Sequence, residues 1–240
     1  MRKLLLVLVV SACAVAGYCQ DNLADWQTAA PWSEGTIVDN DGKEIKGLLK
    51  YNDLDGLLLF RNDETEKTFT ARNIFSFSFT DASRDILRRF YSLEYEDPVN
   101  NAKRPLFFEV LNEFKQFSIL IKKDPVVFNQ QDGSAGNSNN SMKDANGVIR
   151  AQQTETIYFM SQQGVIEPYL ELEVTQTNGL FNERVRNKRK VVDDDLPKKY
   201  FGEKNYAKIL SFAKENKLRL SRKEDFLRVI DYYREIVSKK

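Results

Sequence analysis

The residues most able to do chemistry are carboxylates on segments that alternate like β-strands. Glu94, Glu96 and Asp97 form one group, and later segments carry Glu109, Glu113, Glu171 and Glu173. Glycosidases hydrolyse their substrates with two carboxylates at a set separation, one of which has a raised pKa. Alternate residues of a half-buried strand also face solvent. We therefore interpret these positions as solvated surface, with a paired-carboxylate hydrolase as the alternative.

The composition excludes most other catalytic classes. The chain has no histidine, and its only cysteines, Cys13 and Cys19, both precede Gln20. Ser-His-Asp and Cys-His catalysis, a histidine general base and imidazole-ligated zinc are therefore absent. We predict no catalytic residue, no cofactor and no metal site, and we lean towards a protein that is not an enzyme.

Two acidic motifs resemble cation sites. Asp53-Leu54-Asp55-Gly56 matches part of a calcium loop, but the alignment puts Tyr51 at the first ligand position and Asn62 at the last, where carboxylates are needed. We predict a hairpin turn there instead. Asp193-Asp194-Asp195 is interpreted as a charge cluster that complements the dipole of a following helix.

One basic run could bind anions. Residues 184–190 include Arg184, Arg186, Lys188, Arg189 and Lys190, which could contact phosphate or anionic lipid. Because the three aspartates at 193–195 follow and partly neutralise it, we interpret the run as a solvated linker.

The overall charge and hydrophobic content also disfavour some classes of protein. The 240 residues carry 36 Lys+Arg against 35 Asp+Glu, and 42% are hydrophobic. This indicates one large domain or two small ones, and it disfavours both a disordered chain and a nucleic-acid binder driven by net charge.

Residues 1–19 have the layout of an export signal. A positive start at Arg2 and Lys3 precedes the apolar run 4–10, and small residues follow. We favour cleavage before Gln20. Cleavage before Gly17 and lipidation at Cys13 stay open. The apolar run is too short to span a membrane, which takes about 20 residues, and no later window approaches that length.

Residues 20–181 read as a β-rich body. Short alternating segments separated by turns such as Asn40-Asp41-Gly42 predict antiparallel hairpins, and the first five strands are expected to form a small curled sheet or partial barrel. Phe75, Phe77 and Phe79 alternate with serine and are predicted to be a core stripe. The polar residues 129–153 predict a mobile loop.

Residues 182–240 are predicted to be a helical region. Asp195 is the expected N-cap of a helix that ends near Gly202, and 203–216 carries an apolar face. Ser221 and Glu224 form a capping box for the last helix. The expected fold class is α+β: an antiparallel, hairpin-rich body followed by a C-terminal helical hairpin.

Two stretches carry a resemblance. The first is Gly35-Thr36-Ile37 with the run Asp41 to Gly47. The second is a tail that contains Tyr200-Phe201-Gly202, Lys214-Glu215-Asn216, Glu224-Asp225-Phe226 and Tyr232-Tyr233. These stretches resemble uncharacterised exported proteins of Bacteroidota. The resemblance implies a periplasmic or outer-membrane-associated location and no reaction.

These observations favour a non-catalytic exported protein that binds another component of the cell envelope. The expected partner is a protein, with a glycan as a second option and no nucleic acid. The alternatives are a carbohydrate-active or other hydrolase and a small-ligand carrier with a β cavity. An interaction protein should show a flat aromatic patch or a bare sheet edge, whereas a carrier should show a cavity.

Overall fold

The computed structural model describes residues 31–53, 55–63, 65–81, 85–97, 101–125, 141–143, 149–179 and 182–238. The predicted signal at 1–19, with Cys13, Gly17 and Gln20, lies outside these residues, as does most of the predicted loop at 129–153.

Twelve strands in the described part of the chain form one antiparallel sheet, in the order β12-β11-β10-β8-β7-β6-β5-β1-β2-β3-β4, with β9 paired to β10. Their bounds are β1 Ser33–Asp39, β2 Glu44–Asn52, β3 Leu57–Arg61, β4 Glu66–Phe69, β5 Ile74–Asp81, β6 Ile86–Glu96, β7 Lys103–Glu113, β8 Phe117–Pro125, β9 Ser141–Lys143, β10 Ile149–Ser161, β11 Ile166–Gly179 and β12 Asn182–Val191. Three helices follow: α2 Leu196–Phe201, α3 Glu203–Glu215 and α4 Lys223–Ser238. The predicted α+β class is confirmed.

Strands β1 to β6 curl around one hydrophobic core, as the predicted partial barrel required, but the sheet stays open. Phe77 and Phe90 stack at the centre of this core with ring centroids 4.5 Å apart. Tyr51 reaches across the curl, and its ring lies 5.9 Å from that of Phe107 on β7. The curl therefore brings β2 close to β6 and β7, which are not its neighbours in the sheet.

Two glycines permit the close packing of the first hairpin. Gly35 and Gly47 pair across β1 and β2. A Cβ at Gly47 would lie 2.5 Å from the Phe60 ring, and one at Gly35 would lie 2.4 Å from the carbonyl oxygen of Ser78. Both distances are below van der Waals contact, so these positions require the absence of a side chain.

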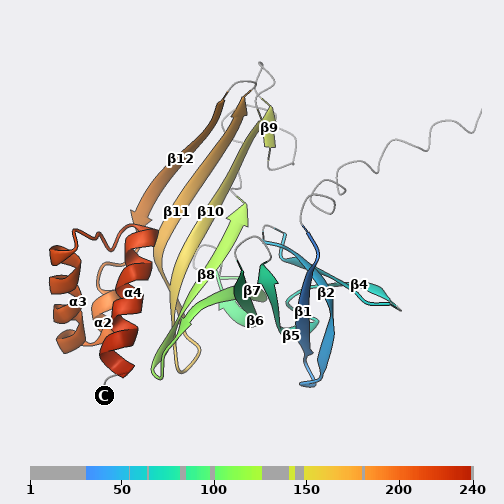
Figure 1. Cartoon of the computed structure of the whole chain (residues 1–240), viewed down its shortest axis with the longest axis horizontal. Helices are drawn as coiled ribbons and strands as arrows, with labels where there is room; N and C mark the ends of the chain where they lie inside the picture. Colours follow the sequence, from blue (N-terminus) through green and yellow to red (C-terminus); the bar gives the residue numbers. More distant parts are fainter. Residues whose placement is uncertain are drawn as a thin grey trace, which may run out of the picture.

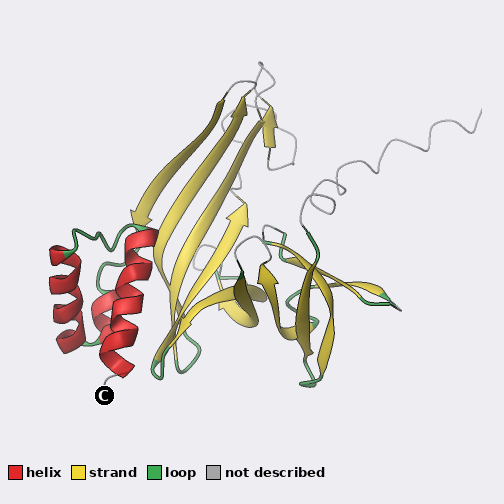
Figure 2. Ribbon diagram, in the orientation of Figure 1, coloured by secondary structure: helices red, strands yellow, loops and turns green. Residues whose placement is uncertain are grey.

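A second core lies under the helices, which gather at the opposite end of the molecule from the curl (Figures 1 and 2). Ile119, Ile157 and Phe159 on the sheet pack there against Phe226 and Ile230 of α4. None of the helices that the structure describes has the length and apolar character of a membrane-spanning segment.

The helical tail largely matches its prediction. Asp195 precedes α2, although its side chain makes no cap hydrogen bond, and Gly202 ends that helix with a φ of 75°. Helices α3 and α4 form the hairpin, with the connecting Leu218 buried between them and the sheet.

The opposite face of the sheet carries no described helix. Phe108, Leu120 and Tyr158 are buried there, surrounded by partly buried apolar side chains. Tyr95 of β6 lies over Tyr158 of β10, with ring centroids 5.7 Å apart.

Strands β7 and β8 separate after a short ladder. Their pairing runs from Glu113 with Ser118 to Glu109 with Ile121 and goes no further. Beyond that point β7 stays paired with β6 as far as Lys103, and β8 stays paired with β10 as far as Pro125. Figure 1 shows β8 continuing beside β10 while β7 follows β6. We call this opening the fork.

Three predictions need correction. Residues 182–191, placed in a helical region and interpreted as a linker, form β12, which pairs with β11 along ten residue pairs. Within the predicted loop at 129–153, residues 141–143 and 149–153 lie in β9 and β10. Paired strands satisfy the backbone hydrogen bonds of these polar segments, so the segments need no apolar core of their own.

Phe75 does not belong to the core stripe. Its side chain is 51% exposed, whereas Phe77 and Phe79 are buried. The ladder between β1 and β5 shifts register at Val38 and Asp39, and Ile74 occupies the core position that the strict alternation assigned to Phe75.

Candidate functional site

The fork contains a pocket of about 690 Å³. Its walls come from the β2–β3 turn, the β4–β5 turn, β6, β7 and β8. The lining side chains are those of Tyr51, Asp53, Asp55, Thr70, Ala71, Arg72, Arg88, Phe90, Arg104, Pro105, Leu106, Phe107, Glu109, Ile121, Lys122, Lys123 and Asp124, and Gly56 completes the set. A volume of this size is within the range of small-molecule sites.

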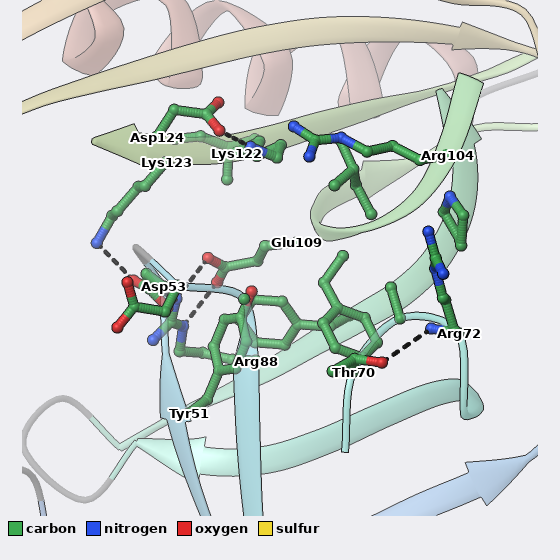
Figure 3. A pocket seen from close by; sticks show the side chains of 18 residues that line it. Tyr51, Asp53, Thr70, Arg72, Arg88, Arg104, Glu109, Lys122, Lys123 and Asp124 are labelled. Carbon is green, nitrogen blue, oxygen red and sulfur yellow. Dashed lines mark hydrogen bonds and ion pairs between the residues drawn. The ribbon is translucent and has the colours of Figure 1, made fainter. Parts of the chain in front are cut away.

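Arg88 organises one side of the pocket (Figure 3). It donates from Nε and Nη2 to the two carboxylate oxygens of Glu109 at 2.9 and 2.7 Å, and Nη2 lies 3.4 Å from Asp53. A guanidinium matches a carboxylate in this two-point geometry. Both carboxylates raise the pKa of Arg88 above its ordinary value, against the effect of burial.

The ion pairs continue to the helical tail. Lys123 donates to Asp53 at 2.7 Å and lies 3.9 Å from Glu155 of β10. Lys223 at the start of α4 donates to Glu155 at 2.5 Å. A continuous chain of alternating charges therefore joins the β2–β3 turn to α4 between the two hydrophobic cores.

An aromatic wall lies beneath Arg88. The guanidinium carbon is 4.9 Å from the centre of the Phe90 ring, and the Tyr51 ring packs edge-on against Phe90 at 4.7 Å. Burial, reinforced by the charge of Asp53, raises the pKa of Tyr51. Tyr51 therefore stays protonated and is no general base at neutral pH.

A group of cations occupies the other side of the pocket. Figure 3 shows Arg72 and Arg104 away from Asp53, and within the described ranges neither guanidinium has a carboxylate partner. Lys122 pairs with Asp124. Burial and then the nearby charge of Arg104 lower the pKa of Lys122 to about 8.

The carboxylates predicted from the sequence do not meet. Glu94 and Glu96 are exposed, Glu113 pairs with Arg89 at 3.1 Å, and only Glu109 lines the pocket. Glu171 and Glu173 lie 3.5 and 3.8 Å from Lys190 and Lys188 of β12. Asp97 is half-buried at the end of β6.

Asp53 and Glu109 are the two carboxylates that come together, and both bind Arg88. Arg88 and Lys123 together balance the two negative charges, which is the arrangement of a structural ion-pair network.

The cation-like motifs have other roles. Asp53, Asp55 and Gly56 lie at the predicted turn between β2 and β3, where the Gly56 N–H donates to the Asn52 carbonyl at 3.0 Å. Asp193 accepts a hydrogen bond from the Asp195 N–H at 2.9 Å. No cluster of acidic side chains able to hold a metal occurs among the residues described.

Sequence reasoning missed Arg88, Arg104 and Lys123. One signal was available, because Arg88 precedes Phe90 by two residues on a strand and so had to share its inward face. The partners of Arg88 and Lys123 could not be read from the pattern, since Asp53 lies 35 and 70 residues away along the chain.

Comparisons with known proteins place the chain in no family. No protein-family model matches the chain, and no match is found among curated proteins or among solved structures.

Proposed function

We propose that this protein is an exported, non-catalytic component of a bacterial cell envelope that binds another envelope protein. The pattern of residues 1–19 and the resemblance to exported proteins of Bacteroidota support export to the periplasm or to the outer membrane. The observation that carries the binding function is the sheet face without a described helix.

This face has the character of an interaction surface. Phe75 is 51% exposed, and its ring lies edge-on to Tyr91 at 5.7 Å. Partly buried apolar side chains continue the surface across β6, β7, β10 and the start of β11, namely Leu93, Tyr95, Leu106, Val110, Met160 and Ile166. Contiguous aromatic and apolar surface is enriched in protein interfaces.

The edges of the sheet support the same function. Strands β12 and β4 each pair on one side only within the described sheet. An unpaired edge can accept a strand from another protein. The exposed Lys188, Arg189 and Lys190 of β12 disfavour indiscriminate pairing and favour a partner with acidic side chains.

The test is purification of the tagged protein from its own envelope in mild detergent, followed by mass spectrometry and by reconstitution with the purified partner. We expect one near-stoichiometric protein. Phe75→Ser should weaken its binding about tenfold or more, because an exposed aromatic anchor is lost.

Leu210→Ser is the matched control, since Leu210 is a comparably exposed apolar residue on α3, away from this face. Equal loss in both variants, or a protein that elutes alone, would contradict the proposal. The same spectra identify the mature amino terminus and so decide between Gln20, Gly17 and a lipid on Cys13.

A further inference from the structure

The pocket in the fork is a second candidate for binding, because it holds two arginines that pair with no carboxylate of the described residues; it shares Leu106 with the sheet face proposed above as the interaction surface. Most lining charges are paired within the protein. Asp53 and Glu109 bind Arg88 and Lys123, and Asp124 binds Lys122. Asp55 is exposed on the β2–β3 turn and accepts a hydrogen bond from Asn52.

Arg72 and Arg104 are left without a carboxylate among the described residues that surround the pocket. Arg72 comes from the β4–β5 turn and Arg104 from β7. The curl of the sheet brings both into the lining of one pocket, and the two guanidinium groups can approach a ligand from different elements.

A second cation, the ammonium group of Lys122, lies near Arg104. The Lys122 side chain is only 12% exposed, and the charge of Arg104 adds to burial in lowering its pKa. Lys122 already pairs with Asp124, whereas the exposed Arg104 has no such partner among the described residues. An anion bound beside Arg104 would reduce the repulsion between these two cations.

Apolar groups line the space between the cations and the aromatic wall. Ala71, Pro105 and Leu106 are half-buried there, and Phe107 is buried beside them. A ligand that fits must therefore combine a negative head with an apolar body.

We propose that the fork pocket binds a small organic anion whose carboxylate or phosphate head contacts Arg72 and Arg104 and whose apolar body lies against Pro105 and Leu106. This binding does not depend on a protein partner and needs no catalysis. It assigns to the opening between β7 and β8 a role that the ladder alone does not explain.

The test uses three probes with the same tail: octanoate, octyl phosphate and octylammonium, titrated calorimetrically into the purified protein. We expect the two anions to bind and octylammonium not to bind. The tighter of the two anions identifies the preferred head group. Arg72→Gln and Arg104→Gln should each weaken anion binding roughly tenfold, the effect of losing one charge-assisted hydrogen bond.

Arg228→Gln is the matched control, because Arg228 is an exposed arginine on α4 outside the pocket. The double charge reversal Arg72→Glu with Arg104→Glu should abolish anion binding and allow octylammonium to bind, and circular dichroism checks that this variant is folded. The proposal would be overturned if the unaltered protein bound neither anion or bound octylammonium equally well. It would also be overturned if both glutamine variants bound the anions with unchanged affinity.

Discussion

At the scale of single residues, Arg88 connects parts of the chain that no hairpin joins. It contacts a turn residue 35 positions earlier and a strand residue 21 positions later. Its side chain is 19% exposed, and those of Asp53 and Glu109 are 20% and 18% exposed. Since all three groups have lost most of their hydration, removing one of them leaves charge that water solvates poorly.

Replacing Arg88 with methionine should therefore lower the free energy of unfolding by about 2 kcal/mol, less than for a fully buried pair because some solvent reaches the site. Adding Glu109→Leu should restore a large part of that loss, because no buried carboxylate then lacks its partner. Urea unfolding followed by circular dichroism measures both variants.

The neighbouring Arg89 gives the control. It pairs with Glu113 at the surface, where both side chains are 44% exposed, and Arg89→Met should change stability by about 0.5 kcal/mol or less. Equal destabilisation by Arg88→Met and Arg89→Met would show that the ion pairs of Arg88 stabilise the fold no more than a surface ion pair does.

At the scale of elements, hydrogen bonds to the carboxylate of Glu167 connect α2 to β11. Glu167 accepts hydrogen bonds from Lys199 Nζ at 2.6 Å and from the Tyr200 hydroxyl at 2.6 Å. Burial opposes its ionisation, but these two donors prevail and lower the pKa of Glu167 below its ordinary value. The interaction therefore stabilises the fold at pH values above the ordinary glutamate pKa, and the stabilisation is lost as the pH falls through the lowered pKa.

Glu167→Gln should consequently lower stability by about 1 kcal/mol at pH 7, and the difference from the unaltered protein should shrink as the pH is lowered towards 3. Thermal unfolding at pH 7, 5, 4 and 3 measures this. Glu203→Gln is the control, since Glu203 pairs with Lys198 while its own side chain is 84% exposed. A destabilisation by Glu167→Gln that stays constant with pH would refute the assignment.

At the scale of the whole molecule, the helices complete a core that the sheet cannot bury alone. Ile119, Ile157, Phe159 and Leu170 have no exposed surface in the presence of α2, α3 and α4. Burial of each such side chain stabilises a protein by about 1.5–3 kcal/mol. The sum is comparable to the whole net stability of a domain, about 5–15 kcal/mol.

Deletion of residues 192–240 should therefore give a sheet that aggregates or unfolds. Size-exclusion chromatography and near-ultraviolet circular dichroism report the result. A soluble monomer that keeps the native near-ultraviolet signal would show that residues 31–191 are an independent domain and that the tail is only an appendage.

Short-range sequence patterns were enough to predict the local features. Asn40-Asp41-Gly42 specified the first turn, alternation specified most strands of the body, and Gly202 marked the end of α2, because turns and helix ends depend on residues a few positions apart. The sequence identified Glu109 as a candidate site residue, but it could not identify Arg88 as the cation that binds it.

The remaining features depend on contacts between distant parts of the chain. Strand β12 exists because the edge of β11 pairs with a basic segment that has no strand pattern of its own. The register shift beside Val38 turns Phe75 outwards, and the divergence of β7 from β8 makes the pocket that holds Arg72 and Arg104. Each of these features depends on how distant strands curl past one another, and short-range patterns carry no information about that curvature.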